Sequence, residues 1–408
     1  MKQCELLAPA GNLSKFDMAL RYGADSIYLG GKRFGLRVLA GNFDQDELKL
    51  AVDRAHAMGK RVYVTVNLFA RDGDFEGMAE YLIYLDQIGV DALIIADVGV
   101  IQFVQKTIPN MEIHLSTQAN TMNTYAANFW HDHGVKRIVL ARELHLTQIE
   151  AMRKSVPDSL ELEVFVHGSM CMAYSGRCAI SSYLTGREAN QGHCTQPCRW
   201  EYHLVEQKRP GEIYPIEEDE KGLHFFNSKD LNMMPHLKAL LDTGVDSLKI
   251  EGRMKSEHYV AAVTSAYRNE IDSYYQDPAN YTPDASSVGQ LSRVTYRPYT
   301  TGFFFGGAHE ELQNVEKAEY IKQWDYIAKV VEVTGDPNKA WVVEFNPFEL
   351  GDMVEILHPD GSYGESKLVD IRDEAGEQVN RVNHPRQKVL VTFTHPVEEL
   401  AILRKLRD

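Results

Sequence analysis

Two things are scarce in this sequence: cysteine, and long uninterrupted runs of apolar residues. No window of the 408 residues approaches the roughly 20 apolar residues that a membrane-spanning helix needs, and the start lacks the apolar stretch of a signal peptide. We therefore expect a cytoplasmic protein with no membrane partner. Only five cysteines are present, and in a reducing compartment we do not expect them to form disulfides.

Basic residues are also in short supply compared with acidic ones. The chain carries 43 Lys and Arg against 58 Asp and Glu, which gives a formal charge of −15. Such a charge repels nucleic acid in general, so any RNA contact must use a local basic patch. Two groups of residues form either such a patch or a solvated charged face: Arg381, Arg386 and Lys388, and Arg404, Lys405 and Arg407.

The first three-fifths of the chain alternates short β-rich runs with amphipathic helical patterns. The runs are rich in Val, Ile and Leu and mostly lack polar alternation, as is typical of strands buried on both faces of a parallel sheet. About eight repeats of strand and helix predict an α/β fold, a TIM-type (β/α)8 barrel. An open doubly wound sheet is the alternative, and one of the nine runs must lie outside a barrel. The nine predicted strands are 5–8, 26–29, 61–66, 92–96, 113–116, 137–141, 161–167, 223–227 and 247–250.

Polar residues directly follow many of these predicted strands. Barrel enzymes build their active sites from side chains at the carboxyl ends of the strands, which favours the barrel over the open sheet. For any single residue, a helix cap or a loop hydrogen bond is the alternative. The residues are Asn67, Asp97, Gln118, Glu143, His167, Lys229, Glu251 and Arg253.

The pattern changes after a long helical run at 256–276. From residue 327 onward short strands return, separated by turn residues and not by helical patterns, which predicts a small C-terminal all-β barrel domain. We therefore predict a barrel domain at 1–290, and a second domain at 291–408 made of a connecting segment and the β barrel. Its predicted strands are 327–333, 341–345, 353–357, 366–371 and 388–393.

Four of the five cysteines cluster at Cys171, Cys178, Cys194 and Cys198. Zinc sites commonly pair cysteines with two to four residues between them, which the last pair satisfies and the first pair does not. Iron–sulfur clusters accept several spacings, so the spacing favours iron–sulfur and leaves zinc as the alternative. A third possibility is a nucleophilic Cys171 paired with His167, four positions earlier.

The segment 161–200 resembles the signature of the collagenase-like peptidases, family U32. The segments ELLAPAGN, DSIYLGG, SLKIEGRMKS and RPYTTGFFFG also resemble the family, so the resemblance extends over essentially the whole chain. The signature positions are occupied by Glu163, Phe165, Gly168, Ser169, Met170, Cys171, Gly176, Cys178, Ile180 and Ser181.

The resemblance implies an activity that the family name does not state. Several members take part in oxygen-independent hydroxylation and carry a 4Fe–4S cluster on four cysteines. One branch, with a single barrel and a C-terminal β domain like this chain, serves prephenate-dependent 5-hydroxylation of the tRNA wobble uridine. The resemblance therefore implies a tRNA-modifying enzyme whose partners are a tRNA anticodon loop and prephenate. Its cluster ligands would be Cys171, Cys178 and Cys194, with Cys198 as the candidate fourth.

Prephenate is a dicarboxylate, so its site should contain basic side chains. We expect Arg177, Lys229, Lys249 and Arg253 to bind the substrate, since a guanidinium group matches a carboxylate with two hydrogen bonds.

The candidate catalytic residues are His167, Tyr174 and Glu251, which would position groups or exchange protons. Two other functions stay open. One is a collagenase-like peptidase that uses Cys171 or a bound metal, and the other is a zinc-stapled RNA-binding or assembly protein.

Overall fold

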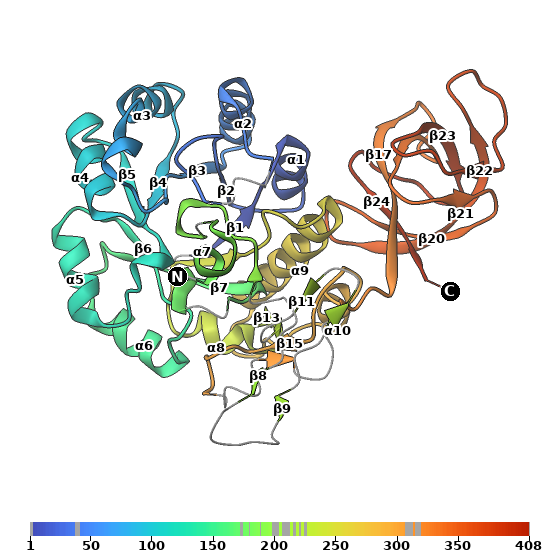
Figure 1. The fold of residues 1–408 in the computed structure, drawn as a ribbon. Coiled ribbons are helices and arrows are strands. Elements are labelled where there is room, and N and C mark those ends of the chain that lie inside the picture. The colour runs from blue at the N-terminus through green and yellow to red at the C-terminus, as the bar shows by residue number, and fades with distance from the viewer. Residues whose placement is uncertain are drawn as a thin grey trace.

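The computed structural model describes residues 3–36, 41–171, 174–178, 180–187, 189–197, 204–205, 213–214, 218–219, 222–223, 227–306, 313–314 and 320–407. In these ranges the chain forms a large α/β barrel followed by a smaller all-β barrel (Figure 1). None of the helices described there has both the length and the apolar character needed to cross a membrane.

Eight parallel strands of the described chain form the N-terminal barrel. Each strand pairs with the next in sequence, and the last one, β14, pairs with both β1 and β7 and so closes the sheet. This closure confirms the predicted TIM-type barrel and excludes the open doubly wound sheet. The strands are β1 Glu5–Pro9, β2 Ser26–Leu29, β3 Arg61–Thr65, β4 Ala92–Ile95, β5 Glu112–Leu115, β6 Arg137–Val139, β7 Glu161–Ser169 and β14 Ser247–Ile250.

One of the nine predicted strands, 223–227, does not belong to the barrel. Its first residue lies in β11 (Gly222–Leu223), which pairs antiparallel with β10 (Glu218–Asp219). Its last residue lies in β12 (Asn227–Ser228), which pairs antiparallel with β16 (Gln313–Asn314), and residues 224–226 lie outside the described ranges. A short apolar run does not reveal its pairing partner, so composition alone could not separate it from the barrel strands.

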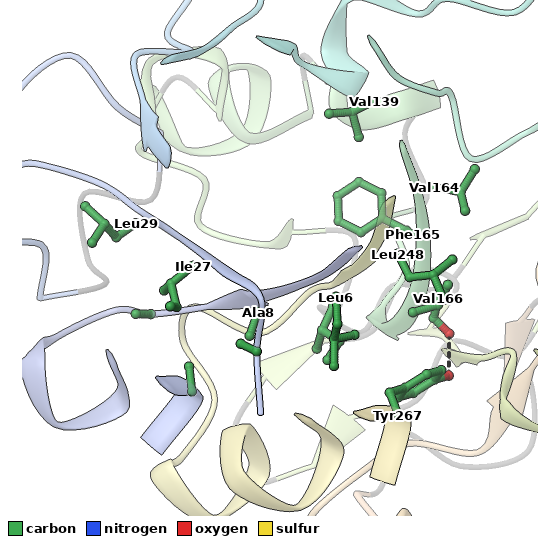
Figure 2. Packing of buried hydrophobic residues seen from close by; sticks show 14 of the residues in the cluster. Leu6, Ala8, Ile27, Leu29, Val139, Val164, Phe165, Val166, Leu248 and Tyr267 are labelled. Carbon is green, nitrogen blue, oxygen red and sulfur yellow. Dashed lines mark hydrogen bonds between the residues drawn. The ribbon is translucent and has the colours of Figure 1, made fainter. Parts of the chain in front are cut away.

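Helices surround the barrel and pack on its outer face (Figure 1). Tyr267 shows how they are attached, because its Oη donates to the backbone oxygen of Val166 in β7 at 2.9 Å (Figure 2). The helices are α1 Leu13–Arg21, α2 Gln45–Ala57, α3 Met78–Gln87, α4 Val98–Thr107, α5 Thr124–Asp132, α6 Leu146–Ser155, α8 Leu237–Leu241 and α9 Glu257–Gln276.

The interior of the barrel holds a buried ionic network. The guanidinium of Arg137 contacts the carboxylates of Glu5, Glu161 and Glu163 at 2.5 to 3.1 Å. Glu163 also binds the Nζ of Lys249 at 2.8 Å. Burial by itself would raise the pKa of Glu163, but the positive charges of Lys249 and Arg137 outweigh it, so the pKa lies below its usual value. The barrel is thus a filled core with paired charges and not a pore.

The C-terminal domain is a closed antiparallel barrel, as predicted. Five of its strands match the predicted runs, and a sixth, β24 (Ile402–Leu406), was not predicted because two basic residues interrupt it. The other strands are β17 Trp324–Val333, β18 Lys339–Glu344, β20 Met353–Leu357, β21 Tyr363–Arg372 and β23 Lys388–Phe393.

Buried polar contacts hold the β domain against the α/β barrel beside α9 (Figure 1). Lys329 Nζ binds Glu257 Oε2 at 2.6 Å, and both residues are buried. Tyr22 Oη, just after α1, lies 3.0 Å from the backbone oxygens of Leu357 and Leu400 in the β domain. The two domains therefore share a specific, partly polar interface.

The position of Arg404 in β24 contradicts the hypothesis that this residue belongs to a basic patch on the surface. Its side chain is fully buried, and its Nε donates to Glu355 Oε1 at 2.6 Å. Its Nη2 also donates to Gln290 Oε1 at 2.5 Å, so the guanidinium ties the domains together. It cannot belong to a solvent-facing basic strip with Lys405 and Arg407.

Candidate functional site

A cavity of about 200 Å³ lies at the carboxyl ends of the barrel strands. Its walls come from residues on or just after β2, β3, β4, β5, β6, β7 and β14, and from the segment after β7 that carries the clustered cysteines. The sequence pattern predicts polar residues at these strand ends, and four of them line the cavity: Asn67, Gln118, Glu251 and Arg253.

Three of the clustered cysteines line this cavity. Cys171 is exposed, Cys178 and Cys194 are half-buried, and all three are free thiols. The Sγ of Cys178 accepts a hydrogen bond from the backbone N–H of Ile180 at 3.4 Å, and the Sγ of Cys194 accepts one from the N–H of Gln196 at 3.4 Å. Backbone donors aimed at sulfur stabilise thiolates and tune clusters that thiolates bind.

The other two cysteines differ from these three. Cys198 lies outside the described residues. Cys4 is buried in the barrel core, and burial raises the pKa of its thiol. Among the described His, Cys, Asp and Glu side chains, no group of three or more converges as a metal site. The structure therefore shows three thiols that share a cavity, without a coordination geometry.

Glu143 anchors the turn between the first two cysteines. Its two carboxylate oxygens accept hydrogen bonds from the backbone N–H of Ser175 at 2.7 Å and from the Oγ of Ser175 at 2.5 Å. Ser175 has a φ of 45°, which is uncommon for a residue with a side chain, so the two bonds hold a strained turn. Glu143 thus holds the cysteine segment in position and is not part of the cavity lining. Asp97, another of the polar residues predicted at strand ends, caps helix α4, where it accepts a hydrogen bond from the backbone N–H of Val100 at 3.0 Å.

Three predicted site residues lie outside the cavity lining. Tyr174 is about half exposed on the cysteine segment. Arg177 is exposed, and its Nε donates to the backbone oxygen of Gln118 at 2.8 Å. Lys229 is half-buried just before β13 (Asp230–Asn232), which pairs with β7. None of these three side chains is part of the cavity lining, and their role in the site stays a prediction.

His167 also lies outside the cavity lining. Regular alternation along β7 would place His167 on the same side as Phe165. The pairing with β14 is irregular at this point, because Phe165 and His167 lie opposite the consecutive residues Lys249 and Ile250. The imidazole is 1% exposed, and burial lowers its pKa to about 3, so it is neutral near pH 7. Three aromatic rings surround it, those of Tyr259, Tyr267 and Tyr299.

The cavity lining includes one carboxylate, Glu251, and the cations Lys249 and Arg253. Glu251 accepts a hydrogen bond from Tyr28 Oη at 3.1 Å. Lys249 Nζ lies 4.5 Å from the centre of the Tyr28 ring, with Glu163 as its ion-pair partner. Arg253 is 4% exposed, and its Nη2 donates to the side-chain oxygen of Asn42 at 2.5 Å. These contacts fix three predicted site residues, Lys249, Glu251 and Arg253, around one space.

Arg142 lines the cavity and was not among the predicted site residues. It lies in the loop after β6, where its Nη1 donates to the backbone oxygen of Ser169 at 3.1 Å. Its guanidinium carbon sits 4.0 Å above the centre of the Phe165 ring. In Figure 2, Phe165 projects from the opposite side of β7 to Val164. The signal that could have identified Arg142 is a basic residue directly after the predicted strand 137–141.

The chain matches known proteins over nearly its full length. The family model for peptidase family U32 matches residues 11–314, and the model for the U32 C-terminal domain matches residues 322–404. The tRNA hydroxylation protein P1 of Bacillus subtilis (strain 168) is 37% identical over 404 residues, which cover 99% of this chain and 95% of that protein. The tRNA hydroxylation protein P of Escherichia coli (strain K12) is 39% identical over 400 residues, covering 88% of this chain and 87% of that protein.

A further relative is named for a different RNA. The 23S rRNA 5-hydroxycytidine C2501 synthase of Escherichia coli (strain K12) is 36% identical over 360 residues, covering 86% of this chain and 52% of that protein. Together the match to the barrel, the match to the C-terminal domain and the identity to these relatives settle the classification: the chain belongs to peptidase family U32.

Proposed function

We propose that this protein is an RNA-modifying enzyme that contributes to oxygen-independent 5-hydroxylation of the wobble uridine of tRNA. The names of its relatives, which refer to hydroxylation of tRNA and of ribosomal RNA, support this class of reaction. The observation that carries the proposal is one cavity at the mouth of the barrel that combines three free thiols with cationic side chains. Thiolates can bind a redox-active iron–sulfur cluster, and cationic side chains can bind an anionic substrate.

The donor set fits a cluster bound by thiolates. Cys171, Cys178 and Cys194 would hold it, with Cys198 from the same segment proposed as the fourth ligand. When bound, a 4Fe–4S cluster would supply one-electron redox chemistry that does not depend on molecular oxygen. Zinc on the same thiols is the alternative cofactor, and it would supply no redox chemistry.

The remaining cavity residues suit an aromatic base beside an anion. The rings of Tyr28 and Phe165 line the cavity beside the cations Lys249 and Arg142, and an unpaired nucleobase would contact these aromatic side chains. Lys249 and Arg253 supply positive charge for the carboxylates of prephenate, the proposed co-substrate. Glu251, which accepts a hydrogen bond from Tyr28 Oη, would accept a proton on its carboxylate.

The peptidase alternative lacks a supporting observation. A nucleophilic Cys171 would need a base within hydrogen-bond reach, and His167 was the candidate. The imidazole is enclosed by tyrosine rings outside the cavity lining, and no hydrogen bond joins it to Cys171 in the described part of the chain.

The proposal is tested by mass spectrometry of tRNA nucleosides from cells that lack this protein. We expect 5-hydroxyuridine derivatives to disappear, to return when the intact gene is supplied, and to stay absent when the supplied gene carries Cys178→Ser. A deletion strain that keeps its full level of these nucleosides would contradict the proposal.

A further inference from the structure

Arg142 has no anionic partner among the described residues, in contrast to two other cations of the barrel. Arg137 contacts three carboxylates, and Lys249 is paired with Glu163. Arg142 makes one hydrogen bond, to the backbone oxygen of Ser169, and it forms no ion pair with any described residue. Its Nε is buried, and no acceptor for it is present in the described ranges.

This arrangement leaves most of the guanidinium's hydrogen-bonding capacity unused. A guanidinium carries five N–H donors in one plane, and a buried charged donor without an acceptor is unfavourable. The carboxylate of Glu143, the next residue, forms no ion pair with Arg142 and instead accepts both of its described hydrogen bonds from Ser175. The charge of Arg142 is therefore available to a ligand that enters the cavity.

The orientation of the group is also fixed in advance. The face of the Phe165 ring lies 4.0 Å from the guanidinium carbon, and the Ser169 oxygen holds one end. A guanidinium held in this way loses little further freedom when it binds two oxygens of one anion. Cys171, Cys178 and Cys194 line the same cavity, so the bound anion would lie beside the thiols.

We propose that Arg142 is an oxyanion-binding residue of this site, which receives either a carboxylate of the small co-substrate or a phosphate of the target nucleotide. Both ligands present paired oxygens to a guanidinium, and both would complete the missing hydrogen bonds. The proposal rests on the proposed function and adds a residue that neither the signature nor the strand-end pattern had indicated.

Binding measurements on the full-length, anaerobically prepared protein separate the two sources. One arm titrates prephenate, with malonate as a generic dicarboxylate. The other arm titrates a synthetic tRNA anticodon stem-loop at fixed salt. We expect Arg142→Gln to weaken one of these ligands by about tenfold to a hundredfold, the usual effect of removing a charged hydrogen-bond donor. Arg142→Lys should recover only part of the loss, since an ammonium group does not form the paired bonds.

Arg386→Gln is the matched control for the small-molecule arm. Its guanidinium also lies 4.0 Å above an aromatic ring, that of Phe345, but it is in the β domain and does not line the cavity. We expect this variant to bind prephenate as the unaltered protein does. The proposal is overturned if Arg142→Gln binds both ligands with unchanged affinity while its iron content and melting temperature also match the unaltered protein. That result would leave the nucleoside test of the proposed function untouched.

Discussion

Cys178 and Cys194 each accept a hydrogen bond from a backbone N–H two residues further along the chain. The two bonds fix the orientation of both sulfurs, which in the proposed function would hold the cluster. Cys4, by contrast, is buried among apolar side chains, and burial raises the pKa of its thiol.

We expect Cys178→Ser and Cys194→Ser to lose most of the iron and sulfide bound after anaerobic purification. Cys4→Ser is the control and should keep both, although it replaces a core residue. Metal and sulfide analysis, together with the visible absorption spectrum, provides the measurement. Tightly bound zinc with no visible absorption in the unaltered protein would contradict the iron–sulfur assignment.

Glu5 makes the stability of the barrel depend on pH. Burial alone would raise the pKa of Glu5, but its contacts with Arg137 prevail and lower the pKa from 4.5 to about 2. A carboxylate whose pKa is depressed in the folded state stabilises the protein above its unfolded pKa and loses that contribution as the pH falls. We therefore expect the free energy of unfolding to drop by about 3 kcal/mol between pH 4.5 and 2 from this group.

Urea denaturation of the metal-free protein at several pH values measures this effect. Glu5→Gln should be less stable near pH 7 and should show a smaller decrease in acid, because the titrating group is gone. Glu374→Gln, at an exposed position, serves as the control and should follow the unaltered protein. An acid profile of Glu5→Gln identical to that of the unaltered protein would argue against the network's role.

Single residues also show where prediction from sequence stops. The cysteine cluster is visible in the spacing, because its members lie close together along the chain. The burial of His167 is not visible in the sequence, because the pairing of β7 with β14 is irregular beside it. Arg404 was misjudged as a surface residue because its partners Glu355 and Gln290 are distant in sequence.

At the scale of elements, the end of β7 is the point where the cysteine segment leaves the barrel. Gly168 has a φ of 107°, and a Cβ at this position would collide with the backbone oxygen of Glu251. Glycine is therefore required twice, by the backbone conformation and by the close approach of the chain that follows β14.

We expect Gly168→Ala to destabilise the protein by several kcal/mol, because strain in φ and a backbone clash act together. Gly59→Ala separates the two causes: its φ is 67°, but a Cβ there would meet no atom of the described residues within 4 Å beyond its own chain neighbours. It should cost about 1 to 2 kcal/mol. Thermal unfolding of both variants provides the comparison. Equal losses of stability would show that the contact between Gly168 and the Glu251 backbone does not add to the effect of φ.

Elements were predicted well where the periodicity is strong. The eight barrel strands and the main helices follow from short apolar runs that alternate with amphipathic patterns. The sequence did not indicate which of the nine runs lies outside the barrel, nor the strand β24, since strand pairing depends on partners that lie far away in sequence. The amino-acid composition of a run predicts whether the strand is buried, but not which other strand it pairs with.

At the scale of the whole molecule, the two barrels meet through a buried ion pair. Lys329 of β17 contacts Glu257 at the start of α9, and its Nζ also donates to Ser14 Oγ at 2.6 Å. Removal of one partner would leave the other charge buried without compensation.

Lys329→Ala is therefore expected to lower the free energy of unfolding by about 3 to 5 kcal/mol. Lys322→Ala removes a more exposed pair, with Asp325, and should cost no more than about 1 kcal/mol. Denaturant titrations of the intact chain measure both. If the two variants lose the same small amount, the Lys329–Glu257 pair does not contribute measurably to the stability of the interface.

The origin of the two halves of the cavity has a consequence for how such enzymes diversify. All three described thiols come from one excursion of the chain after β7, whereas the cations come from the ends of β6 and β14. The part that would carry the redox centre and the part that would select the substrate are thus encoded separately. If the segment after β7 is exchanged between relatives, we expect the metal-binding residues to change while the substrate-binding cations stay the same.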